Sequence, residues 1–134
     1  MMDKLDHLFQ GHAAALKLAS FRQQLLASNI ANADTPHYKA VDIDFAAELS
    51  RVMSGRAAPG TLATTHPRHL PAPGANPLGA RVLYRTDVQG NIDGNTVDMD
   101  RERAQFMENA LRYEAIVRVL NTEIQHMKAA LRTQ

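Results

Sequence analysis

The C-terminal part of the chain has the most regular pattern of apolar and polar positions. From Phe106 to Leu131, apolar residues recur at alternating intervals of four and three, with charged residues between them. This heptad spacing is typical of a helix that buries one narrow stripe against another helix. The eight stripe residues, called the seam below, are Phe106, Ala110, Tyr113, Val117, Leu120, Ile124, Met127 and Leu131.

The seam predicts a long C-terminal helix over residues 98–132. Asp98, Asp100 and Glu102 place negative charge at its start, which suits the helix dipole. Asn95 or Asp98 is the expected N-cap. At about 1.5 Å per residue the helix is roughly 50 Å long, more than a chain of this size is expected to cover. We therefore expect other chains to complete the seam, and the alternative is an ordinary core helix with a regular stripe.

Residues 3–31 predict a second long helix, which Asp3 or Asp6 would cap. Its apolar residues fit no single heptad register and form a broad face, so neighbours are expected on two sides. The two terminal helices predict a mainly α-helical single domain, residues 1–134, in which they pair as an antiparallel coiled coil.

The segment 32–54 predicts a bend followed by a short helix over 45–54. Pro36 cannot continue the first helix, and it suits the second position of a tight turn. If this turn is of type II, His37 must take a positive φ, which glycine would adopt at less cost.

The rest of the middle is less regular. Residues 55–80 contain five of the six prolines and predict an irregular loop. Residues 81–97 predict a small β element, a hairpin with strands at 81–86 and 91–93.

Composition narrows the function classes. The net charge of +1 gives no electrostatic case for nucleic acid or an anionic membrane, and the absence of cysteine excludes thiolate chemistry. His66 and His69 lie three apart without a third ligand nearby, so a local turn is favoured over a metal site. No nucleophile motif, phosphate loop or cofactor motif is present, and no apolar run is long enough to insert in a membrane. We predict no enzyme activity, no cofactor and no metal.

Three segments carry a resemblance to a known family. They are QLLASNIANADTPHYKA at 24–40, DIDF at 42–45 and DGNTVDMDRE at 93–102. The chain resembles the rod and hook proteins of the bacterial flagellum, and among them the short proteins of the proximal rod. The positions that match the first motif are Asn29, Ile30, Ala31, Asn32, Thr35, Pro36 and Tyr38. The family usually has glycine where this chain has His37.

The resemblance implies a structural subunit of the basal body's proximal rod. Such subunits self-assemble through their terminal helices into a helical shaft that transmits torque from the membrane ring to the distal rod and hook. The implied partners are copies of the chain, other rod proteins, the basal-body adaptor protein, the MS ring protein and the flagellar type III export apparatus. The implied location is the periplasmic part of the basal body, reached without a cleaved signal peptide.

Two further expectations follow. The motif residues should shape the bend after the first helix and dock it on neighbouring subunits. The terminal helices of the dilute, isolated chain should be largely disordered, because their partners are absent. The alternative function is that of a soluble helical adaptor or an export chaperone of a secretion system, which would need a folded free state.

Overall fold

The computed structural model describes residues 2–56, 76–85 and 92–132. Its elements are α1 (Met2–Ala31), β1 (Val41–Asp42), α2 (Phe45–Met53), the 3-10 turn η1 (Pro77–Gly79), β2 (Leu83–Tyr84) and α3 (Met99–Arg132). The predicted mainly α-helical fold with long terminal helices is confirmed.

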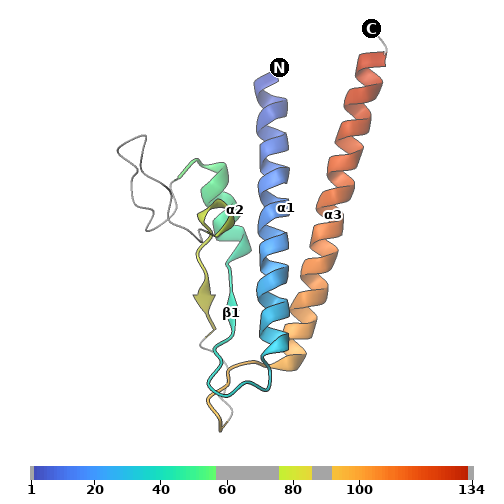
Figure 1. Cartoon of the computed structure of the whole chain (residues 1–134). Helices are drawn as coiled ribbons and strands as arrows, with labels where there is room; N and C mark the ends of the chain where they lie inside the picture. Colours follow the sequence, from blue (N-terminus) through green and yellow to red (C-terminus); the bar gives the residue numbers. More distant parts are fainter. Residues whose placement is uncertain (1, 57–75, 86–91, 133–134) are drawn as a thin grey trace, which may run out of the picture.

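The two long helices run antiparallel and side by side, so both chain termini lie at the same end of the molecule (Figure 1). We call this the terminal end, and the opposite end, where α1 stops and α3 starts, the bend end. Burial is concentrated away from the terminal end. Leu18, Ala19 and Leu26 of α1 are fully buried, whereas Leu5 and Leu8 are more than two-fifths exposed.

The predicted N-caps of the two long helices have different outcomes: the one for α1 is wrong, and Asp98, one of the two candidates for α3, is confirmed. Because α1 begins at Met2, Asp3 and Asp6 both lie inside it and neither is its N-cap. Asp3 lies in the first turn instead, where a carboxylate is favourable to the helix dipole. For α3, Asp98 is the N-cap, since its Oδ1 accepts hydrogen bonds from the N–H groups of Asp100 and Arg101.

Helix α2 packs against α1 on a different side from the main α1–α3 contact (Figure 1), and its first residue, Phe45, also meets α3, where the Arg112 guanidinium lies 4.7 Å from the centre of the ring. Asp44 caps it by accepting a hydrogen bond from the Ala47 N–H at 3.1 Å. A Cβ built on Gly11 of α1 would lie 3.0 Å from the Met53 Sδ, so the missing side chain lets α2 approach closely. The core centres on Leu18, Ile43 and Ala80, surrounded by half-buried residues of α1, α2 and the segment after η1.

The prediction that the strand at 81–86 forms a hairpin with residues 91–93 is wrong. Strand β2 pairs antiparallel with β1, with Val41 opposite Tyr84 and Asp42 opposite Leu83. Residues 92 and 93, expected in the second strand, form a turn instead. The cause is the bend after α1, which brings residues 40–42 alongside 83–85, a long-range pairing that local spacing does not indicate. Of the predicted loop 55–80, residues 57–75 lie outside the described residues, including His66 and His69.

In the part of the chain that the structure describes, every helix is too short or too polar to span a lipid bilayer.

Candidate functional sites: the bend and the seam

The motif residues form the bend at the end of α1. Asn32 folds back onto the helix, its backbone N–H and its Nδ2 both donating to the Ser28 carbonyl at 3.1 and 2.8 Å. Tyr38 N–H donates to the Thr35 carbonyl at 3.3 Å, which closes a turn over Pro36 and His37. His37 has φ 62°, as a type II turn requires at its third position. The conditional prediction of a positive φ at His37 is confirmed.

Asn29 connects this bend to the rest of the chain. It is fully buried, and its Nδ2 donates to the Val41 carbonyl at 2.7 Å and to Glu102 Oε2 at 3.1 Å. Its Oδ1 accepts from the Val41 N–H at 3.0 Å and from the Tyr38 hydroxyl at 3.3 Å. These four bonds use both donors and both lone pairs of the amide. Asn29 therefore joins α1 to β1 and α3 within one chain.

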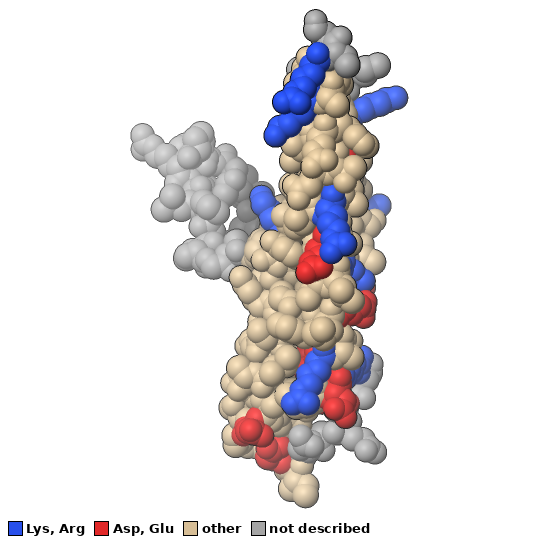
Figure 2. Space-filling view, turned by 90° about the vertical axis from the view of Figure 1, so that its right-hand side faces the viewer, with Lys and Arg blue, Asp and Glu red and all other residues tan. Residues whose placement is uncertain are grey.

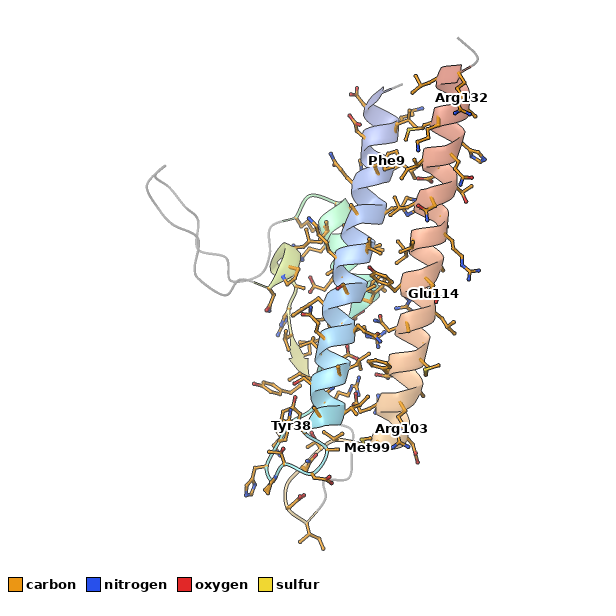
Figure 3. All side chains as sticks on the ribbon, turned by 45° about the vertical axis from the view of Figure 1, so that its right-hand side comes forward. Phe9, Tyr38, Met99, Arg103, Glu114 and Arg132 are labelled. Atoms are coloured by element: carbon orange, nitrogen blue, oxygen red, sulfur yellow. The ribbon has the colours of Figure 1, made fainter. Side chains whose placement is uncertain are left out.

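The other motif residues differ in exposure. Ala31, Thr35 and Pro36 are exposed, whereas Ile30 is half-buried. Figure 3 places Tyr38 and Met99 together at the bend end, far from Phe9 and Arg132. The expectation that the motif shapes the bend agrees with these contacts. Its docking on neighbouring subunits stays a prediction, and the exposed residues are the ones available for it.

A group of four charged residues lies beside Asn29, and we call it the charge cluster: Arg22, Asp42, Arg85 and Glu102. Arg22 Nε and Nη2 donate to the two Asp42 carboxylate oxygens at 2.9 and 3.1 Å. Arg85 donates to Asp42 Oδ2 at 2.6 Å and also pairs with Glu102. The cluster joins α1, β1, α3 and the segment after β2, and its charges balance.

The electrostatics of Asp42 follow from this arrangement. Burial alone would raise the pKa of its carboxyl, but the hydrogen bonds from Arg22 and Arg85 and the charge of Arg22 outweigh burial. The pKa of Asp42 therefore lies below its ordinary value. Asp42 is ionised at neutral pH and holds both guanidinium groups.

Sequence reasoning missed the charge cluster. Its members come from four separate segments, so no local spacing indicates it. Glu102 had one partial signal: it lies seven residues before Asn109, at the same heptad position, and both are polar. We interpreted Glu102 only as a favourable charge at the helix start, whereas its side chain is fully buried.

The seam lies only partly against α1. All eight seam residues are within the described part of α3, and every one is half-buried or exposed. The fully buried residues of α3 are Glu102 and Asn109. Asn109 Nδ2 donates to the Ala19 carbonyl at 2.8 Å and to Gln23 Oε1 at 2.7 Å, so this side of α3 faces α1. At about 100° per residue, the seam is centred roughly 50° away from that direction.

The uncovered part of the seam borders a shallow hollow between the helices. Its lining residues are Leu16, Lys17, Ser20, Phe21, Gln24, Pro77 and Tyr113. Tyr113 is the seam residue among them. The most exposed seam residue is Leu131, which lies near the terminal end and is 75% exposed.

A second set of exposed apolar residues lies on another side of α3. We call it the outer row: Met107, Leu111, Ala115 and Val119, spaced four apart. Met107 and Leu111 are 62% and 65% exposed. Figure 2 looks onto the side of the molecule that lies on the right in Figure 1, and it shows uncharged surface between separate basic and acidic side chains. Such i±4 rows are the ridges with which helices pack against one another.

Within residues 2–56, 76–85 and 92–132, no group of three or more His, Asp and Glu side chains could hold a metal ion.

Comparison with known proteins is consistent with these features. The family model described as "Flagella basal body rod protein" matches residues 9–39, which include most of α1 and the bend. The flagellar basal body rod protein FlgB of Escherichia coli K12 is 47% identical over 136 residues, covering 99% of each chain. FlgB of Yersinia enterocolitica is 46% identical over 134 residues, covering 98% of each. FlgB of Cereibacter sphaeroides is 50% identical over 121 residues, covering 90% of this chain and 91% of the relative.

Proposed function

The chain belongs to the FlgB family of flagellar basal body rod proteins, and we propose that it builds the proximal rod by self-assembly through its terminal helices. In this role it is a structural subunit of a helical shaft, and the shaft transmits torque from the membrane ring to the distal rod and hook.

The observation that carries the proposal is the incomplete covering of the seam. A heptad stripe of eight residues has α1 against one edge only, and three of its side chains are exposed: Tyr113 at 39%, Ile124 at 37% and Leu131, near the terminal end, at 75%. Fully burying one Leu, Ile or Met side chain contributes about 1.5–3 kcal/mol. Helices of neighbouring subunits that fill the hollow and cover the seam gain this free energy, which the isolated chain does not have.

The outer row supports a helical assembly over a closed dimer. It lies on a side of α3 different from the seam, so one chain offers two unlike apolar surfaces. A contact between unlike surfaces is heterologous, and repeating it produces a ring or an open helix. A twofold dimer would pair one surface with itself and leave the other exposed. We assign the seam of one subunit and the outer row of the next to such a contact.

The remaining parts of the proposal come from the family. The partners are copies of this chain, other rod proteins, the basal-body adaptor protein, the MS ring protein and the type III export apparatus. The chain acts in the periplasm after export without a cleaved signal peptide. The names of the relatives support only the basal body rod itself.

The test is a charge placed in the seam where the isolated fold does not use the side chain. Leu131→Asp fits this need because Leu131 is mostly exposed in the single chain. In a motile host lacking its own copy of the gene, the variant is expected to abolish swimming and to leave the protein out of purified rods. Circular dichroism of the purified variant should match that of the wild type.

Asn121→Asp is the matched control, because it adds the same charge at an exposed position of α3 outside the seam. It should swim normally. Leu120→Asp, in the middle of the seam, should fail as Leu131→Asp does. Normal swimming with both seam variants, or a stable, fully ordered free protein that never assembles, would contradict the proposal and favour the adaptor or chaperone alternative.

A further inference from the structure

The end of α1 is closed by a residue that lies just before α3. We propose that Asn95 acts as a latch: the bend after α1 becomes ordered only when the segment 93–97 docks on it. The latch rests on contacts within one chain and is independent of the proposed assembly.

Asn95 binds backbone carbonyls of the bend that directly follows α1. It is fully buried, and the two hydrogens of its Nδ2 are shared among the carbonyls of Asn32, Ala33 and Thr35, at 3.0, 2.8 and 2.8 Å from the nitrogen. Backbone carbonyls at and just beyond a helix C-terminus have no helical partner, and a buried one without a partner is costly. In many helices a local glycine motif closes this end. Here the Asn32 and Thr35 carbonyls also accept the local N–H groups of Thr35 and Tyr38, and a side chain from about 60 positions away adds bonds to both and reaches the Ala33 carbonyl.

The Asn95 side chain is itself held in place. Its Oδ1 accepts from the Val97 N–H at 2.8 Å, and its own N–H donates to Asp93 Oδ1 at 3.1 Å. Both contacts lie within the same short segment, so this segment presents the amide to the bend in a fixed orientation.

Backbone bonds extend the contact along the bend. His37 N–H donates to the Asp93 carbonyl at 3.0 Å, and Thr96 N–H donates to the Tyr38 carbonyl at 3.1 Å. The Ala40 N–H donates to Thr96 Oγ1 at 2.8 Å. Backbone polar groups of residues 32–40 therefore find hydrogen-bond partners in the segment 93–97, and polar groups of that segment find theirs in residues 32–40.

Close approach is possible because Gly94 has no side chain. A Cβ at this position would lie 2.9 Å from His37 Nδ1, and Gly94 has φ 77°. The His37 side chain thus lies directly over Gly94. The turn and the segment therefore fit closely against each other, and we expect them to become ordered together.

The latch gives the chain an order of folding. Its N-terminal motif cannot form a complete bend while residues 93–97 are still inside a ribosome or an export channel that releases the chain N-terminus first. Ordering of the bend and docking of the start of α3 happen together. The family motif at 29–38 is accordingly half of a structure and not a module that folds alone.

The test is amide hydrogen exchange by NMR on the full-length chain at low concentration. In the wild type, the amides of His37, Ala40 and Thr96 are expected to be protected. Asn95→Ala should speed their exchange about tenfold or more, because it removes the closing hydrogen bonds. Exchange of buried α1 residues such as Leu18 and Leu26 should stay within about twofold, since these residues belong to the core outside the latch.

Two further variants keep the result interpretable. Asn121→Ala is the control, an exposed asparagine of α3 whose loss should change no bend amide. Asn95→Ser keeps one donor and should give intermediate exchange, which allows the test to proceed if Asn95→Ala does not fold. Free exchange of the bend amides in the wild type would overturn the latch. Bend amides that stay protected in both Asn95→Ser and Asn95→Ala would also overturn it. The same holds if the amides of Leu18 and Leu26 lose as much protection in these variants as the bend amides do.

Discussion

The bend end and the terminal end of the molecule are built from the same two helices but are held together differently. At the bend end, Asn29, Asn95 and Glu102 are fully buried and bonded to several segments. At the terminal end, Leu8 is exposed and Leu131 more so, and farther along the helices His12 Nε2 of α1 lies 3.3 Å from Glu123 Oε1 of α3. The bend end buries its polar groups in contacts within the chain, whereas the terminal end leaves apolar side chains exposed.

This difference has a physical reason. Buried polar groups are stable only in one arrangement that satisfies all their bonds, so they fix the register of the helices and the path of the chain. Exposed apolar side chains accept any complementary surface, which suits contacts with several neighbours. The expectation of disordered terminal helices in the free chain can therefore be sharpened: disorder should be concentrated at the terminal end, and the bend end should keep its structure.

The largest loss in the free energy of unfolding is expected from Glu102→Ala, which breaks the charge cluster. The change leaves the buried Arg85 guanidinium with one carboxylate fewer and removes an acceptor of Asn29. Removing one partner of a buried ion pair costs about 3–5 kcal/mol. Urea denaturation followed by circular dichroism measures the loss.

Glu108→Ala is the control for Glu102→Ala, because Glu108 pairs with Arg112 at 3.2 Å on the surface of the same helix. Its loss should cost at most about 1 kcal/mol. Equal effects of the two variants would mean that the bend end is no more strongly held than the surface of α3.

A smaller effect is expected from truncating one leucine of α1 at each end. Leu26→Ala removes a fully buried side chain near the bend end and should cost about 2–4 kcal/mol. Leu8→Ala removes a largely exposed one and should cost about 0.5 kcal/mol. The same denaturation curves report both. A larger loss from Leu8→Ala would show that the isolated chain already covers its terminal end.

Acid should weaken the bend end through Asp42. Because its folded-state pKa lies below the unfolded value of about 3.9, its contribution is complete above that pH and is lost as the pH falls toward the folded-state pKa. The urea midpoint of the wild type should therefore drop between about pH 5 and about pH 3, a range that includes the unfolded-state pKa of about 3.9. Asp42→Asn should be less stable at pH 5 and show a smaller drop. Asp34→Asn, which changes an exposed carboxylate at the bend end, should keep the wild-type drop.

The two ends also differ in how far the sequence predicts them. Helix α3, the broad face of α1 and the turn at Pro36 are local patterns, and each is found where the spacing places it. The pairing of β1 with β2 and the charge cluster join segments that are distant in sequence, so periodicity carries no signal for them. Asn95 shows the limit of prediction from local sequence. Its residue type and its place before α3 predict an N-cap of α3, but its side chain binds the carbonyls of the bend after α1.

The smallest effect on the free energy of unfolding is expected at His37, whose backbone takes a positive φ. A non-glycine residue at φ 62° costs about 1–2 kcal/mol, but glycine also loses more entropy on folding, about 0.5–1 kcal/mol. His37→Gly should therefore stabilise the chain by about 0.5–1 kcal/mol. His37→Ala is the control, since it removes the imidazole and keeps the strained backbone. If both variants destabilise equally, the contact of the imidazole with Gly94 outweighs the backbone strain, and histidine is then part of what holds the bend end closed.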